Sequence, residues 1–259
     1  MYFPPPPFDL AEARLCALLV DAAYDMSDQW EAQGRPRRET RFEWRPTGPQ
    51  DMSYSDPVWG APRLLHFFRE PAPFGFVSWR GATGYLVLRG TQTPSDVIQD
   101  LRADQEPYSR IDGWGEVHEG FEDVYQGVAV DLLNTLSALP PSVGRLVVTG
   151  HSMGSAIATL ALPEIPMRTR FGSHQLIHYN LASPRVGGPE FAARYAALRV
   201  PTYRVVNDSD LVTQVPPPVF GRTLYQHVGV PVTFNVQRGS IEGNHSAKEV
   251  YLPALEGAA

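Results

Sequence analysis

The chain has a single cysteine and no long apolar stretch. Cys16 lies in the apolar run 15–20, so no disulfide can form within these residues, and we expect a buried free thiol rather than a nucleophile. No apolar run approaches the roughly 18 residues that a membrane span requires, so we expect no transmembrane segment. The first residues, Met1–Pro7, lack the basic region and long apolar core of a secretory signal peptide, and we therefore expect a cytoplasmic protein.

The chain also lacks an excess of basic residues. Its 259 residues include 22 Lys and Arg against 28 Asp and Glu, which gives a net charge of −6. Proteins that bind nucleic acid usually carry a concentrated basic surface, so we expect no nucleic-acid partner. The chain has 259 residues, 43% of them hydrophobic, so it can bury a large core. We expect a single domain over residues 1–259.

Short strands alternate with helices along most of the chain, which predicts a mainly parallel sheet flanked by helices. Residues 27–63 show no sustained periodicity, so we expect an irregular surface insertion or a disordered segment there. The predicted strands cover residues 65–68, 75–79, 85–88, 146–149, 176–180, 203–206 and 228–236. The predicted helices cover residues 9–26, 120–139, 155–162 and 190–198, with a further helix from about residue 246.

The pentapeptide Gly150-His151-Ser152-Met153-Gly154 directly follows a β-branched run and directly precedes a helix-forming run. It predicts a sharp strand–turn–helix connection that presents Ser152 as a nucleophile. Such a turn brings its backbone close to neighbouring elements and leaves no room for side chains at the flanking positions, where the sequence has glycines.

A serine nucleophile requires an imidazole to take its proton and an acid to orient that imidazole. In serine hydrolases with this strand–turn–helix motif, the chain order is Ser, then acid, then His. Asp208 and Asp210 follow the predicted strand 203–206, and both are candidates for the acid. His245 follows a Gly-Asn pair on a loop, whereas His227 begins an extended segment, where a structural histidine is typical. We therefore favour His245 as the base.

The oxyanion that forms when Ser152 attacks a carbonyl needs preorganised hydrogen-bond donors. Met153 follows the nucleophile directly, and Thr91 follows the end of the predicted strand 85–88. Their backbone N–H groups are the expected donors, and the Thr91 hydroxyl is a further candidate.

Six segments resemble, in order and spacing, the class 3 lipase family of α/β-hydrolases. They are Leu88–Thr91, Val117–Phe121, Gly150–Gly154, Ser183–Gly187, Val206–Asp210 and His245. The resemblance covers roughly residues 64–252 and implies an α/β-hydrolase fold with Ser152 as nucleophile, Asp210 as acid and His245 as base. The resemblance alone favours Asp210 over Asp208.

The resemblance also implies a lid within residues 92–116, formed by a surface helix. The residues expected on the apolar face of that helix are Val97, Ile98 and Leu101. Three residues further along either extend this apolar surface or pack the loop against the body of the protein. They are Tyr108, Ile111 and Trp114.

We therefore expect a serine hydrolase that cleaves carboxylic esters, such as acylglycerols or other lipid esters, through an acyl-enzyme. Its substrate would be a lipid or small ester, with transient contact to a lipid interface through the lid, and the chemistry needs no cofactor and no metal. Two alternatives remain open. One is a non-catalytic hydrolase-fold protein that binds a lipid or a partner, and the other is an acyltransferase that uses an alcohol as acceptor.

Overall fold

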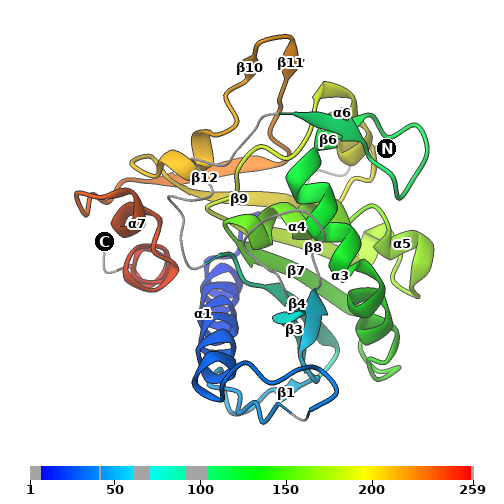
Figure 1. The fold of residues 1–259 in the computed structure, drawn as a ribbon, viewed down its shortest axis with the longest axis vertical. Helices are drawn as coiled ribbons and strands as arrows, with labels where there is room; N and C mark the ends of the chain where they lie inside the picture. The colour runs from blue at the N-terminus through cyan, green and yellow to red at the C-terminus, as the bar shows by residue number, and fades with distance from the viewer. Residues whose placement is uncertain (1–6, 41, 61–70, 92–103, 258–259) are drawn as a thin grey trace.

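A mainly parallel sheet lies at the centre of the structure, a computed structural model that describes residues 7–40, 42–60, 71–91 and 104–257 (Figure 1). Its eight strands are β1 (Ser53–Tyr54), β2 (Val58–Gly60), β3 (Ala72–Arg80), β4 (Thr83–Leu88), β7 (Arg145–His151), β8 (Leu176–Leu181), β9 (Thr202–Asn207) and β12 (Val230–Phe234). The strand order is β1-β3-β4-β7-β8-β9-β12, and β2 also pairs with β3. Strands β4 to β12 along this order are parallel, whereas β3 is antiparallel to its neighbours. The predicted parallel sheet is confirmed.

Helices cover both faces of the sheet (Figure 1). The α-helices are α1 (Leu10–Ala32), α3 (Glu119–Ser137), α4 (Met153–Ala161), α5 (Ile165–Arg168), α6 (Pro189–Ala197), α7 (Ile241–His245) and α8 (Leu252–Leu255). Helices α3, α4 and α6 pack on one face through residues such as Phe121, Ala156 and Phe191. Helix α1 packs on the other face together with the C-terminal turns, for example through Leu19 and Tyr251.

Shorter elements connect the layers. They are the two-stranded sheets β5 (Gln105–Pro107) with β6 (Glu116–His118) and β10 (Val219–Phe220) with β11 (Thr223–Leu224), the 3₁₀ turns η1 (Ser173–Gln175) and η2 (Leu211–Gln214), and the π-helical turn η3 (Ala247–Tyr251). The helix predicted from residue 246 corresponds to η3 and α8. The predicted strand 65–68 lies outside the described residues.

Helix α1 is longer than its sequence pattern predicts. The carboxylate of Asp9 accepts a hydrogen bond from the backbone N–H of Glu12 at 3.0 Å and caps the first turn, as expected. The helix continues past Met26 because Trp30, one turn later, extends the buried face and packs edge-on against Trp59 of β2. The expected irregular segment 27–63 is corrected accordingly, since it begins with the last turns of α1 and contains β1 and β2.

The carboxyl ends of the parallel strands carry the segments that matter for function. β4 ends just before Thr91, β7 ends at His151, and β9 ends at Asn207. Because neighbouring parallel strands end at the same edge of a sheet, the fold gathers the loops that follow them. Cys16 on α1 is fully buried, and burial raises the pKa of its thiol, which fits the expected inert cysteine.

Candidate active site

Ser152 lies in the turn between β7 and α4, within a segment that we call the elbow (residues 150–154). Its backbone has φ 59° and ψ −129°, a combination that residues other than glycine rarely adopt. A Cβ added to Gly150 would lie 2.5 Å from the backbone of Gly154, and one added to Gly154 would lie 2.4 Å from the carbonyl oxygen of Leu88. Only glycines therefore allow β7, α4 and β4 to approach closely enough to form this turn.

Asp210 and His245 are joined by a buried hydrogen bond. His245 Nδ1 lies 2.7 Å from Asp210 Oδ2, and both side chains are fully buried. The hydroxyl of Tyr251 donates to the same carboxylate oxygen at 2.7 Å, and the backbone N–H of Val212 donates to Oδ1 at 3.0 Å. Because a carboxylate only accepts, His245 Nδ1 carries the proton and Nε2 of the neutral ring presents its lone pair.

The alternatives for the acid and the base lie elsewhere. Asp208 is exposed, so the structure brings Asp210 and not Asp208 to His245. His227 bonds through Nε2 to the carbonyl oxygen of Thr213 at 3.0 Å. Burial, together with the positive charges of two nearby arginines, lowers the pKa of His227 to about 3, which is typical of a structural histidine.

The loop that carries the acid and the loop that carries the base are bonded to each other. Asn207 Nδ2 donates to the carbonyl oxygen of Asn244 at 2.9 Å, and Asn207 Oδ1 accepts from the backbone N–H of Val236 at 2.9 Å. Asn244 Nδ2 donates in return to the carbonyl oxygen of Ser209 at 3.0 Å. These bonds fix the separation of Asp210 and His245 through the backbone segments that precede them.

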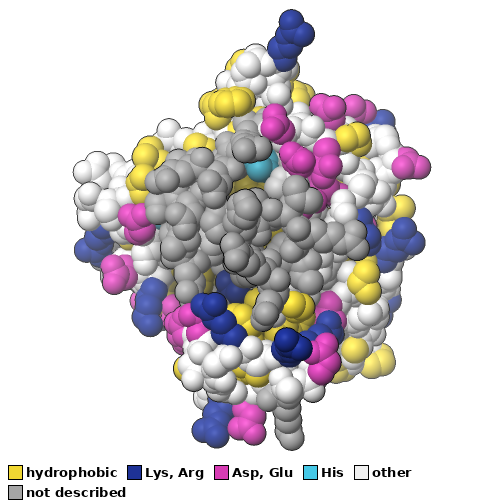
Figure 2. Space-filling view, in the orientation of Figure 1, with side chains coloured by type: hydrophobic (Ala, Val, Ile, Leu, Met, Phe, Trp, Pro, Cys, Tyr) yellow, Lys and Arg dark blue, Asp and Glu magenta, His cyan; other side chains and the backbone are white. Residues whose placement is uncertain are grey.

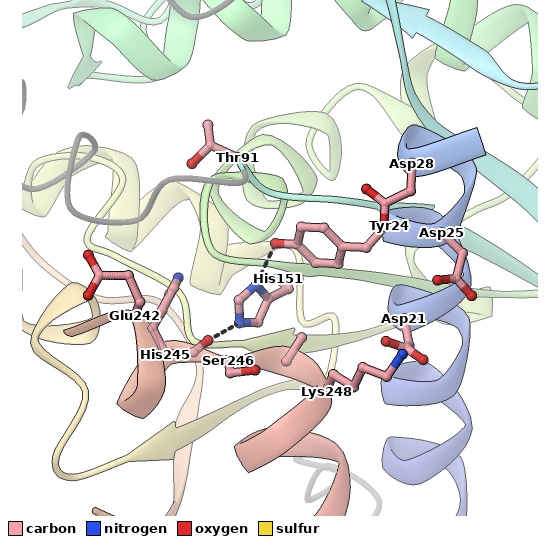
Figure 3. Close-up of a pocket in the computed structure, with 11 residues that line it drawn as sticks. Asp21, Tyr24, Asp25, Asp28, Thr91, His151, Glu242, His245, Ser246 and Lys248 are labelled. Atoms are coloured by element: carbon pink, nitrogen blue, oxygen red, sulfur yellow. Dashed lines mark hydrogen bonds between the residues drawn. The ribbon is translucent and has the colours of Figure 1, made fainter. Parts of the chain in front are cut away.

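Sequence reasoning missed two residues that connect the elbow to its surroundings, Tyr24 and His151 (Figure 3). His151 Nε2 lies 2.8 Å from the carbonyl oxygen of His245, and a carbonyl can only accept, so Nε2 carries the proton. Nδ1 of neutral His151 is then the acceptor for the Tyr24 hydroxyl at 2.8 Å. The Tyr24 oxygen accepts in turn from the backbone N–H of Gly90 at 3.1 Å. One chain of hydrogen bonds thus links the Gly90–Thr91 segment, the elbow and the backbone of His245.

Burial fixes the protonation states of Tyr24 and His151 in this series of hydrogen bonds. It lowers the pKa of His151 well below its usual range. Burial also raises the pKa of the Tyr24 hydroxyl, so it remains a donor. The rings of His151 and His245 lie 4.5 Å apart between centroids. His151 is therefore a neutral side chain packed against the ring of His245.

Thr91 and Met153 lie where the elbow meets the end of β4. Met153 opens α4, so its N–H belongs to the first turn, where helices have no internal acceptor. Thr91 is buried, and within the described part of the chain its hydroxyl has no hydrogen-bond partner. A Cβ on the preceding Gly90 would lie 2.6 Å from the Tyr24 hydroxyl and 2.8 Å from Ser152 Cβ, so the two segments are in close contact.

Ser152 Oγ and His245 Nε2 are both buried polar atoms without a hydrogen-bond partner among the residues described. The two atoms therefore form no hydrogen bond with each other in this structure, and each is free to bond to a substrate. A pocket of about 390 Å³ reaches this region (Figure 3). Its lining residues are Asp21, Tyr24, Asp25, Asp28, Thr91, His151, Glu242, His245, Ser246, Ala247 and Lys248.

The predicted apolar lid residues, Val97, Ile98 and Leu101, lie outside the described residues. The segment that follows the expected lid helix packs against the body of the protein. Tyr108 is buried and donates to the carbonyl oxygen of Leu160 at 2.8 Å. Ile111 and Trp114 are partly buried against the core. Of the two expectations for these three residues, packing is confirmed.

The described ranges contain no group of three or more His, Cys, Asp or Glu side chains that could hold a metal ion. None of their helices combines the length and the apolarity needed to span a bilayer.

The family model "Lipase (class 3)" matches residues 85–220, just over half of the chain. The chain belongs to the class 3 lipase family. The match includes Ser152 and Asp210 but neither His245 nor α1.

Curated lipases from two fungi are similar to this class 3 lipase family member. The lipase of Rhizopus niveus is 35% identical over 153 residues, which cover 57% of this chain and 38% of that protein. The lipase of Rhizomucor miehei is 35% identical over 151 residues, which cover 57% of this chain and 40% of that protein. The chain thus spans about two fifths of the length of these relatives.

A solved structure confirms the fold of this family member. The native complex of Rhizomucor miehei lipase with its propeptide superposes with a TM-score of 0.68 at 26% sequence identity, covering 86% of this chain and 68% of that one. The predicted α/β-hydrolase fold is confirmed.

Proposed function

We propose that this protein is a serine hydrolase that cleaves carboxylic esters, with Ser152 as nucleophile, His245 as base and Asp210 as the acid that orients His245. The buried 2.7 Å hydrogen bond between Asp210 and His245 carries the proposal, because it leaves His245 Nε2 as a free base at the end of the sheet where the elbow lies. The strained backbone of Ser152 gives further support, because strain of this kind clusters at active sites.

Acylation begins when Ser152 Oγ attacks the ester carbonyl carbon and passes its proton to His245 Nε2. The carbonyl oxygen becomes an oxyanion, which accepts hydrogen bonds from the backbone N–H groups of Met153 and Thr91. Asp210 stabilises the imidazolium without taking its proton. His245 then donates the proton to the leaving alkoxide, which departs as an alcohol and leaves an acyl group on Ser152.

Deacylation repeats these steps with water as the nucleophile. His245 Nε2 removes a proton from water as the water oxygen attacks the acyl carbon, and the same two N–H groups receive the oxyanion. Collapse of this intermediate returns the proton to Ser152 Oγ and releases a carboxylic acid. The catalytic cycle consumes one ester and one water and yields one alcohol and one acid.

The proposed substrates are lipid esters, acylglycerols among them. The support is the family and the two fungal relatives, which are both named lipases. We further propose that the expected lid, with Val97, Ile98 and Leu101 on its apolar face, covers the site and contacts the lipid surface.

Hydrolysis of p-nitrophenyl butyrate tests the proposal. We expect the wild-type protein to release p-nitrophenol and Ser152→Ala to lower kcat by at least about 10⁴-fold, because the residual rate comes only from binding and the oxyanion donors. Ser137→Ala, which removes an exposed hydroxyl at the end of α3, is the matched control and should keep full activity. Unchanged turnover in a folded Ser152→Ala protein would contradict the proposal.

A further inference from the structure

Exposed large hydrophobic side chains concentrate in one short part of the described chain. Of eight such side chains among the residues that the structure describes, five lie between residues 211 and 230, and each is 48–62% exposed. These five are Leu211, Val219, Phe220, Leu224 and Val230. Single exposed apolar residues are common, but a cluster on one element marks an interaction surface.

Three of the five lie on the β10–β11 hairpin. This hairpin projects beyond the body of the molecule (Figure 1), and hydrophobic side chains gather on the same projection in the space-filling view (Figure 2). Val219 pairs with Leu224 across the hairpin, whereas Phe220 pairs with Thr223. The turn residue Gly221 has φ +61°, and a Cβ added there would meet no atom within 4 Å, so the turn has free space at this position.

The charge of this region differs from that of the rest of the chain. Residues 211–237 contain no Asp, Glu or Lys and a single Arg, Arg222 at the hairpin turn, although the whole chain has a net charge of −6. Insertion of the tip into an apolar medium would therefore bury no carboxylate, a group that is very costly to desolvate. The long side chain of Arg222 can place its charge at the level of lipid headgroups while its stem stays among apolar groups.

Two acidic residues at the base of the hairpin disfavour an anionic surface. The negative charges of Asp104 and Glu116 lie close to Tyr225, where they add to the effect of burial in raising the pKa of that hydroxyl. A strongly anionic membrane would be repelled by these groups and by the net charge of the chain. The geometry therefore favours a lipid surface without net charge.

Hydrogen bonds attach the hairpin to the segment that follows the expected lid. Gln105 Nε2 donates to the carbonyl oxygen of Leu224 at 2.9 Å, and the Tyr225 hydroxyl donates to the carbonyl oxygen of Asp104 at 3.2 Å. Asp104 and Gln105 directly follow residues 92–103, where the lid is expected. On the other side, η2 directly follows Asp210 and leads into the hairpin.

We propose that the β10–β11 hairpin is a lipid-docking element that inserts Val219, Phe220 and Leu224 into a surface without net charge. The proposal rests on the proposed function, because the docked lipid is the source of the ester substrate. A second copy of this chain fits the hairpin less well. Stable protein interfaces bury about 800 Å² on each partner, whereas this projection offers a narrow tip.

Binding to phosphatidylcholine vesicles tests the docking, with Ser152→Ala as the background so that no lipid is hydrolysed. We expect this protein to float with the vesicles. The triple variant Val219→Ser, Phe220→Ser and Leu224→Ser should lower the partition coefficient by about tenfold or more, because each apolar side chain that enters the surface contributes to binding. The control changes Val130→Ser and Met167→Ser, which remove equally exposed apolar side chains on α3 and α5 and should leave binding unchanged.

The outcomes separate docking from catalysis. In the active protein, the triple variant should hydrolyse soluble p-nitrophenyl butyrate with kcat/KM within about twofold of the wild type, which also shows that it folds. Equal vesicle binding by the triple variant and the control variant would overturn the docking proposal, as would absence of binding by the starting protein. A wild-type dimer that becomes monomeric in the triple variant, measured by light scattering, would identify a self-interface and also overturn it. Failure to hydrolyse the soluble ester would contradict the proposed function but leave vesicle binding to be judged separately.

Discussion

The hydroxyl of Tyr24 on α1 donates a hydrogen bond to His151 Nδ1 in the elbow, with 2.8 Å between the two atoms. The two residues are 127 positions apart, and Tyr24 lies outside the segment that the class 3 lipase model matches. The same hydroxyl accepts from Gly90, next to the proposed oxyanion donor Thr91. The N-terminal helix therefore helps to position the proposed active site.

Tyr24→Phe removes the donor to His151 and the acceptor for the Gly90 N–H while it keeps the aromatic ring. We expect kcat for p-nitrophenyl butyrate to fall by about tenfold to a hundredfold with KM within about twofold, because a displaced oxyanion donor weakens the transition state more than substrate binding. Tyr54→Phe removes a hydroxyl that bonds to Pro49 away from the site and is the control. Equal kcat values for the two variants would show that Tyr24 has no positioning role.

Asp210→Asn and Asp208→Asn are a matched pair two residues apart. Asp210 is buried against His245, whereas Asp208 is exposed. Loss of the carboxylate allows the wrong tautomer of the imidazole, so we expect Asp210→Asn to lower kcat by about 10³- to 10⁴-fold. Asp208→Asn should stay within about twofold of the wild type. A larger loss of kcat in Asp208→Asn than in Asp210→Asn would show that Asp208 is the acid and would contradict the proposed role of Asp210.

Histidines that are buried in the neutral form make stability depend on pH. Burial lowers the pKa of His178 and His227 to about 3, and that of His151 well below its usual range. Between about pH 6.5 and pH 4, the unfolded chain binds protons at these positions and the folded protein does not. The free energy of unfolding therefore decreases as the pH falls, by about 1.4 kcal/mol per pH unit for each such histidine.

Urea unfolding of His227→Gln at several pH values measures this effect. In this variant, the slope of the free energy of unfolding against pH should be smaller by the contribution of one proton. The comparison is with the wild type and with the exposed control His174→Gln. A slope that is unchanged in His227→Gln would mean that this histidine takes up its proton in the folded protein.

The elbow, the sheet and the family were predictable from sequence because each depends on residues that are close together in the chain. The local pattern left the choice between Asp208 and Asp210 open, since both lie in one polar turn, and only the family resemblance favoured Asp210. The contacts with His245 and Tyr251 separate the two residues physically. Tyr251 and Asp210 are bonded although they lie 41 positions apart in the sequence, and the local sequence pattern does not indicate such a contact. For Asn207 a signal existed, because it opens the Asn-Asp-Ser-Asp segment that the resemblance had marked.

Other expectations stay predictions. They concern the apolar lid face, the organisation as a single domain and the cytoplasmic location. The extent of α1 was underestimated because the residues between Met26 and Trp30 are polar, and the burial of Trp30 depends on Trp59 from a distant strand.

Mass spectrometry of the protein after reaction with a fluorophosphonate tests the central claim most directly, because this reagent labels only an activated hydroxyl. We expect a single adduct on Ser152, strongly slowed labelling in His245→Ala and normal labelling in the control His227→Ala. A folded wild-type protein that remains unlabelled, or that carries its adduct on another residue, would contradict it.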